Sequence, residues 1–145
     1  MERKRFGRFA CAISRIHHGI QQLKTAEMQQ YGLKAVHVMC LYLLSIEPEG
    51  LSSAALVEQT GEDKAAISRA VKELRERDLV KPAADNSRSY GVPWVLTPQG
   101  VGLAAEVNDT IRDLFSKYAP ETTEEERAVF YRVLLQISDN LSSAK

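Results

Sequence analysis

Two short helices around a single glycine, in the middle of the chain, restrict the fold more than any other feature of the sequence. Ser52 or Ser53 can cap the first helix, because a side-chain oxygen at that position accepts a hydrogen bond from a free N–H group of the first turn. Gly61 breaks this helix, and Asp63 can cap a second helix over residues 64–77. The pattern predicts two helices joined by a tight turn.

The spacing at which apolar residues recur changes after this pair of helices. Residues 81–84 and 92–96 are predicted to form two short strands around a polar tip. Pro82 and Pro93 have no N–H to donate, so these strands fit only a small sheet with exposed edges. We expect a hairpin, or wing, over residues 81–96 and no larger sheet.

A long first helix is predicted from apolar residues that recur at spacings of three and four. From about residue 4 to 30, at 1.5 Å per residue, it would be roughly 40 Å long, more than a compact monomer of this size covers. Gly32 is expected to end it. The apolar seam consists of Phe6, Phe9, Ile13, Ile16, Ile20 and Leu23. Such a narrow seam favours a partner helix.

Three further helices complete a mainly α fold. An apolar stripe that ends before Pro48 predicts a buried core helix. Thr97 as cap and Pro98 at the first helical position open a long fifth helix, and Thr123 with Glu126 forms a capping-box pattern before the last one. The three stripes are Val36, Met39, Cys40, Leu43 and Leu44; Leu103, Val107, Ile111, Leu114, Phe115 and Tyr118; and Phe130, Val133, Leu134, Ile137 and Leu141.

The composition is that of one globular domain in a reducing compartment. The 145 residues are 44% apolar and 26% charged, an ordinary globular balance. Lys+Arg and Asp+Glu each total 19, so any surface that binds nucleic acid must be local. Two cysteines are too few for a disulfide framework, and no stretch resembles a membrane span or a secretory signal. We expect a single domain over residues 1–145, in the cytoplasm, without a membrane partner.

The second helix of the central pair carries the functional signal. Ile67, Val71 and Leu74 share one face at about 100° per residue, so the other residues project outward. The outer face combines two alanines, which let a backbone approach base edges, with side chains that donate to phosphates or bases. Glu73 and Glu76 also face outward, so the alternative is a solvated helix of mixed charge. The candidate DNA-binding residues on this helix are Lys64, Ala65, Ala66, Ser68, Arg69 and Lys72.

A set of short motifs extends through the helix pair and the wing. It consists of Leu51, Ser52, Leu56, Gly61, Asp63, Lys64, Ile67, Ser68, Arg69, Leu74, Leu79, Val80, Leu96, Thr97 and Gly100. With these motifs nearly the whole chain resembles the MarR-type winged helix-turn-helix transcriptional regulators (multiple antibiotic resistance regulators). The resemblance implies a winged helix-turn-helix over 33–97 and a homodimer whose dimerisation helices lie within 1–32 and 98–145. Each recognition helix would lie in a major groove of a palindromic operator, with half-sites about 34 Å apart. Repression is the expected role, although the residues do not distinguish a repressor from an activator.

The resemblance also implies roles for individual residues. Lys64, Ser68 and Arg69 match the DNA-facing positions of the family, and the two candidate alanines stand where it usually has Ser or Thr. The wing of the family usually has an acidic residue followed by two arginines. Here Arg88 comes first and no arginine follows, so Arg88 is the candidate for a minor-groove contact. Asp78 replaces the usual glycine after the recognition helix, where a left-handed backbone is expected.

Regulators of this type often respond to phenolic or drug-like ligands, or to oxidants through a cysteine, in the crevice between the dimerisation helices and the winged domain. A small-molecule effector is therefore an expected partner. Cys11 lies on the first helix, roughly where the hydroperoxide-sensing branch has its reactive thiol, and Arg8 and Arg15 flank it at i−3 and i+4. The commoner role of such a cysteine is packing, which is also the role expected of Cys40. Three bulky residues are expected either to line a ligand cavity or to belong to the core. They are Tyr31, Tyr42 and Trp94.

Other functions have less support. The three histidines form no clustered ligand set, so we expect them at the surface or in a pocket and predict no metal or cofactor. Gly100 and Gly102 lie inside a predicted helix and form no phosphate loop, and no nucleophile elbow is present, so an enzyme is not expected. The main alternative is a winged-helix protein-interaction module that does not bind DNA, because the net charge is zero and the wing motif is altered. The histidines are His17, His18 and His37.

Overall fold

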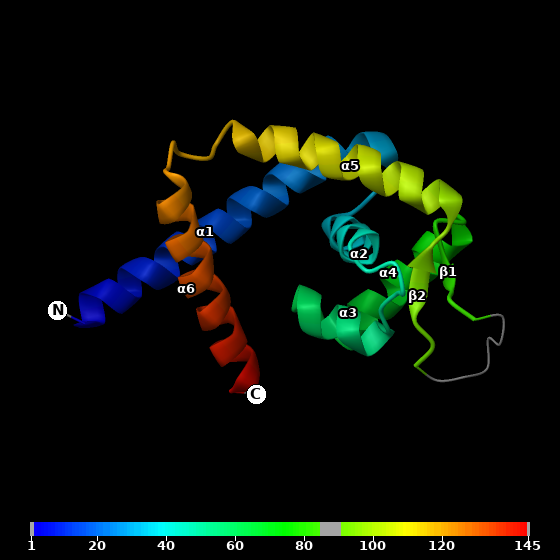
Figure 1. Cartoon of the computed structure of the whole chain (residues 1–145), viewed down its shortest axis with the longest axis horizontal. Coiled ribbons are helices and arrows are strands. Elements are labelled where there is room, and N and C mark those ends of the chain that lie inside the picture. Colours follow the sequence, from blue (N-terminus) through cyan, green and yellow to red (C-terminus); the bar gives the residue numbers. More distant parts are fainter. Residues whose placement is uncertain (1, 85–90, 145) are drawn as a thin grey trace. The chain divides into compact units, whose positions relative to one another are not determined.

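The computed structural model describes residues 2–84 and 91–144 (Figure 1). The chain forms two compact units, residues 1–111 (unit 1) and 112–145 (unit 2). The described residues are mainly helical and contain one small two-stranded sheet, as the sequence predicts. Among them no helix is both long and apolar enough to cross a membrane. The single domain expected over 1–145 stays a prediction.

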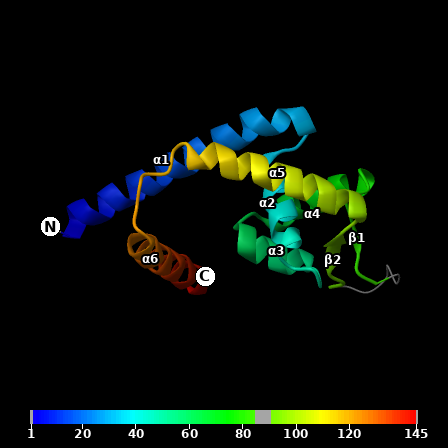
Figure 2. The same cartoon turned by 45° about the horizontal axis from the view of Figure 1, so that its top comes forward.

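The helices of unit 1 begin and end close to the caps that the sequence contains. Gly32, with a φ of 66°, ends the first helical segment as predicted. The Ser52 hydroxyl accepts the N–H of Ala55 at 3.1 Å, and Gly61 ends the same helix with a φ of 75°. The bounds are Glu2–Met28 for α1, Gln29–Tyr31 for the 3-10 helix η1, Ala35–Ser45 for α2, Ser53–Thr60 for α3 and Lys64–Glu76 for α4 (Figures 1 and 2).

The strands of the wing differ from the predicted ranges. β1 is Val80–Pro82 and β2 is Trp94–Leu96, whereas the sequence predicts 81–84 and 92–96. The Pro93 carbonyl accepts the N–H of Ala83 at 2.8 Å, but Pro93 has no N–H to return, so the regular pairing ends there. The antiparallel pairs are Val80 with Leu96, Lys81 with Val95 and Pro82 with Trp94. The base of the wing is therefore a very short sheet.

A third segment is attached to this sheet. Leu51 and Trp94 exchange both backbone hydrogen bonds, with N–O distances of 3.1 and 2.8 Å. Gly50 has a φ of 94°, and a Cβ on it would lie 2.5 Å from the Trp94 carbonyl oxygen. Only glycine allows this close approach. The bridge joins the base of the wing to the chain that enters α3.

The core of unit 1 is one cluster that centres on α2. Its predicted stripe is buried at Cys40 and Leu44, but Val38 and Leu41 are buried as well. The reason is that α2 contacts α1, α3, α4 and β2, so it is covered on more than one face. The buried apolar residues are Met28, Leu33, Val38, Cys40, Leu41, Leu44, Leu56, Ile67, Ala70, Val71, Leu74, Leu79, Val80, Ala104 and Val107.

His37 is buried in this core, which contradicts the expectation of a surface or pocket-lining histidine. It is 4% exposed, and its Nδ1 accepts the N–H of Lys34 at 3.0 Å at the start of α2. Its Nε2 lies 3.7 Å from Oε2 of Glu73 on α4. Burial lowers the pKa of His37, and the nearby Glu73 carboxylate opposes this shift only in part. The His37 imidazole therefore caps the start of α2 from within the core.

Helix α5, Pro98–Ser116, begins at the base of the wing and continues from unit 1 into unit 2. As predicted, Thr97 caps it: Oγ1 accepts the N–H of Gly100 at 3.0 Å and donates to the carbonyl of Asp78 at 2.6 Å. Asp78 has a φ of 60°, the left-handed backbone expected there. A Cβ on Gly100 would clash with the carbonyl of Leu79, so α5 packs directly on the chain that leaves α4.

Unit 2 contains the last helix, α6, which spans Glu124–Ser143. The hydroxyl of Thr123 accepts the N–H of Glu126 at 3.1 Å, as the cap pattern predicts. None of the described α6 residues is buried. The predicted apolar stripe is thus open to solvent in the single chain, with Phe130 58% and Leu141 65% exposed.

We predict that His37 makes the stability of the protein sensitive to acid. Because its pKa is lowered in the folded state, the unfolded chain binds this proton more readily, and the free energy of unfolding falls as the pH falls below about 6.5, the ordinary histidine pKa. Above that pH the free energy of unfolding has its full value, and below the lowered pKa of His37 it stops falling. Urea unfolding between about pH 8 and pH 5 measures it.

A matched pair of variants isolates this contribution. His37→Gln retains an acceptor for the N–H of Lys34 but does not titrate, so its stability should depend less on pH than that of the wild type. His17→Gln, on the exposed side of α1, should behave like the wild type. The prediction is wrong if all three proteins lose the same free energy of unfolding over this range.

Candidate DNA-binding surface

The inner face of α4 determines which side of the helix is exposed. Asp63 caps the helix, and its Oδ1 accepts the N–H of Ala66 at 2.7 Å. The buried residues of the helix recur at spacings of three and four, so one complete face is held in the core. They are Ile67, Ala70, Val71 and Leu74. The opposite face, over the first turns, is thereby turned to solvent.

The predicted DNA-facing residues lie together on this outer face, which we call the basic front. Ala66 is half-buried, and the others are exposed. Within residues 2–84 and 91–144, none of the three cations of the basic front forms an ion pair, so each is available for an anion. The helix N-terminus adds a partial positive charge. The basic front comprises Lys64, Ala65, Ala66, Ser68, Arg69 and Lys72.

The candidate DNA-binding residue in the wing is Arg88. Arg88 falls in the segment 85–90, outside the described residues, so its predicted minor-groove role stays a prediction. β1 and β2 lie beside α4 in both views (Figures 1 and 2), and β1 contacts that helix. The base of the wing is therefore fixed against the recognition helix candidate.

Trp94 links three elements in a way that the sequence analysis missed. Its indole Nε1 donates to the hydroxyl of Ser53 on α3 at 3.1 Å. The Arg75 guanidinium of α4 lies 5.6 Å from the centre of its ring, a cation–π distance. A tryptophan on a strand and an arginine in the last turn of a helix carry no local signal of this contact. Arg75 thus has a partner within the protein.

The two cysteines have different environments. Cys11 is exposed on α1, so an oxidant has access to it, and its sensor role stays a prediction. Cys40 is buried, as expected of a packing residue. Burial, with a contribution from the Glu62 carboxylate, raises the pKa of Cys40 to about 11. A thiol of that pKa is unreactive at neutral pH.

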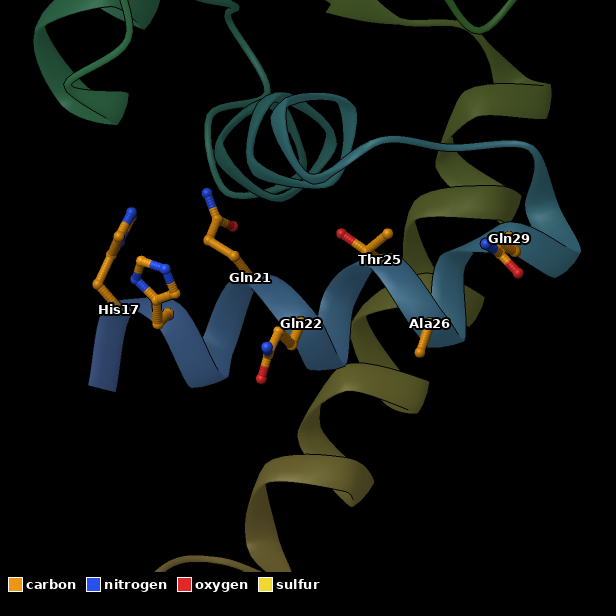
Figure 3. A pocket seen from close by; sticks show the side chains of 7 residues that line it. His17, Gln21, Gln22, Thr25, Ala26 and Gln29 are labelled. Atoms are coloured by element: carbon orange, nitrogen blue, oxygen red, sulfur yellow. The ribbon is translucent and has the colours of Figure 1, made fainter. Parts of the chain in front are cut away.

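A surface hollow lies along α1. All but one of the residues that line it belong to this helix, the exception being Gln29 at the start of η1. Figure 3 shows Gln21 and Thr25 pointing toward α2 while Gln22 and Ala26 point away. Its volume is about 610 Å³. The lining residues are His17, His18, Gln21, Gln22, Thr25, Ala26 and Gln29. A hollow formed by side chains of one continuous helical segment offers a ligand little enclosure.

The second hollow lies between α2, β2 and α5, and its volume is about 550 Å³. Apolar side chains form most of its wall, and Asn108 donates from Nδ2 to the Ser45 hydroxyl at 3.2 Å. It is lined by Leu44, Ser45, Pro48, Val95, Leu96, Val101, Ala105, Asn108 and Asp109. The three bulky residues suggested by the sequence, Tyr31, Tyr42 and Trp94, line neither hollow. Within the described part of the chain, no three His, Cys, Asp or Glu side chains come together as a metal site would require.

Comparison with known proteins connects this geometry to a family. Residues 31–89 match the model of the MarR family. No curated protein matches the sequence significantly. A MarR family protein of Mycobacterium tuberculosis, Rv2887, solved in complex with salicylic acid, is 25% identical, with 87% of this chain and 93% of that chain covered and a TM-score of 0.67.

Two other solved structures share the fold at lower identity. The S. aureus MepR–DNA complex is 15% identical, with 92% of this chain and 97% of that chain covered and a TM-score of 0.74. CouR from Rhodococcus jostii RHA1, bound to p-coumaroyl-CoA, is 20% identical, with coverages of 90% and 91% and a TM-score of 0.79.

The matched segment and the shared fold agree with each other. Residues 31–89 contain α2, α3, α4 and β1, which are the helix pair, its supporting core helix and the first strand of the wing. The shared fold extends over nearly the whole chain. Residues 31–89 are therefore similar to the MarR family, and nearly the whole chain has the winged helix-turn-helix fold of these solved structures.

Proposed function

We propose that the protein is a transcription regulator that binds duplex DNA through α4. The observation that carries the proposal is the basic front: unpaired Lys64, Arg69 and Lys72 on the exposed face of a helix whose other face is fixed in the core. Small side chains beside them leave room for base edges, and the cations suit phosphates. The fold shared with a protein solved on DNA adds support.

The proposed active form is a homodimer that binds a palindromic operator. In the single chain α1 exposes its apolar seam, with Phe6 72% and Ile16 56% exposed, and α6 likewise exposes its stripe. Contiguous apolar surface of this kind marks a protein interface. Two copies joined through these helices would present two basic fronts to successive major grooves, about 34 Å apart.

The proposed effector site is the hollow between α2, β2 and α5. Its lining comes from α2, β2 and α5, and α2 contacts the recognition helix candidate. Its volume suits a small aromatic compound. None of its described lining residues is cationic, so we propose a neutral aromatic ligand in preference to an anionic one.

The remaining parts of the proposal follow from DNA binding. The protein acts in the cytoplasm and performs no catalysis, since its function needs only binding. A protein-interaction module that does not bind DNA is the second candidate, favoured by the equal numbers of acidic and basic residues. Retention of the wild type on heparin and on random duplex DNA at low salt separates the two.

We predict that Arg69→Ala weakens binding to an operator selected from a random DNA pool about tenfold or more, because it removes a donor from the basic front. Shift assays at several salt concentrations measure the affinity. Arg15→Ala, an exposed arginine on α1, is the control and should stay within about twofold of the wild type. Equal affinity of Arg69→Ala and the wild type would contradict the assignment of that residue, and no binding by the wild type would favour the interaction module.

We predict that Ile16→Glu converts the dimer to a monomer, because it places a charge in the apolar seam. Light scattering after size-exclusion chromatography gives the mass. Gln22→Glu introduces the same charge on the opposite side of α1 and should leave the dimer intact. If Ile16→Glu stays dimeric, the seam is not the interface.

We predict that salicylamide raises the unfolding temperature more than salicylate does, because the lining of the proposed effector hollow carries no cation. Ala105→Phe fills this hollow and should abolish the shift. Ala26→Phe fills the hollow along α1 and should retain it. A larger effect of salicylate, or an undiminished effect in Ala105→Phe, would refute the proposed site.

A further inference from the structure

The segment between α1 and α2 is attached to the C-terminal end of α4 by one arginine. Arg77, the residue that follows α4, donates from Nη2 to the carbonyl of Tyr31 at 2.9 Å and from Nη1 to that of Gly32 at 3.2 Å. Both carbonyls lie where the first helical segment ends, and such groups carry a partial negative charge. The planar guanidinium matches two neighbouring acceptors at once, which an ammonium group does not.

A second attachment lies one turn earlier on α4. Oε2 of Glu73 is 3.9 Å from Nζ of Lys34 and 3.7 Å from Nε2 of His37. Among the described residues, this Nε2 is a buried polar atom without a hydrogen-bond partner. The Glu73 carboxylate lies just beyond hydrogen-bond distance of the buried Nε2, so the strength of this contact depends on the position of α4.

The same segment is also joined to α5. The hydroxyl of Tyr31 lies 3.3 Å from Oγ1 of Thr110 and donates to Oε1 of Glu106 at 3.4 Å. Residues 31–37 thus contact α5 on one side and the last turns of α4 on the other. Along the helix axis, Glu73 lies about 6 Å and Arg77 about 12 Å from Arg69, so a tilt at that end displaces the basic front.

We propose that Arg77 and Glu73 are positioning residues, which set the orientation of α4 relative to the α1–α2 segment and thereby its fit to an operator. The inference rests on the proposed function, in which α4 is the recognition helix. It differs from a direct role of Arg77 as a phosphate contact. Positioning affects the operator selectively, whereas a phosphate contact affects every DNA and changes the salt dependence.

The conservative substitution Arg77→Lys tests the proposal, because it retains the charge for a phosphate but loses the paired donation to the two carbonyls. We expect operator affinity to fall about fivefold to tenfold, with binding to random DNA and the slope of log affinity against log salt unchanged. Arg15→Lys on α1 is the control. Affinity within about twofold of the wild type, or an equal loss on random DNA, would overturn the proposal.

Glu73→Ala provides an independent variant, since alanine favours the helix and removes both contacts. Removing an acid near DNA by itself tightens binding, so weaker operator binding supports positioning, and equal or tighter binding overturns it. Thermal unfolding verifies that each variant is folded, and if Arg77→Lys is not, Glu73→Ala decides. The proposed function fails if the wild type binds no DNA. The present inference alone fails if Arg69→Ala weakens operator binding and these two variants do not.

Discussion

The burial of one face of α4 is the contact on which the rest of the structure depends. Ile67, Val71 and Leu74 are each less than 5% exposed and join the same core as α2 and α3. Each such side chain contributes roughly 1.5–3 kcal/mol on burial, so rotation of the helix about its axis is strongly disfavoured. The basic front is exposed as a consequence of this packing, because burial of one face of a helix turns the opposite face to solvent.

Apolar packing fixes the rotation of α4, and polar contacts at its ends fix its tilt. Asp63 holds the first turn, Arg77 holds the end against the α1–α2 segment, and Arg75 covers Trp94 at the base of the wing. The Arg77 contact involves η1 and its C-cap, and the Arg75 contact involves β2, so a displacement of either of these segments reaches α4. The core around α4 can therefore stay folded while the tilt of this helix changes.

The sequence predicts the helices well because their ends are local events. The caps at Ser52, Asp63 and Thr97 depend on residues a few positions away, and the structure has them as expected. The bridge between Leu51 and Trp94 joins residues that are far apart in the sequence, so no local pattern predicts it. The same reason explains His37: its burial results from α2 being covered by several elements, and no periodicity within one helix contains that information.

The candidate DNA-binding surface shows the same difference between features set by nearby residues and contacts between distant ones. Helical periodicity and the cap at Asp63 were enough to place the basic front on one exposed face, whereas the Arg77 contact joins residues that are 45 and 46 positions apart. Zero net charge is compatible with DNA binding for a related reason. The cations of α4 are concentrated on one face, and several of the acids lie elsewhere, as in the cluster at the start of α6. Screening limits the repulsion between a distant acid and DNA to about 8–10 Å, so the local surface outweighs the sum of charges.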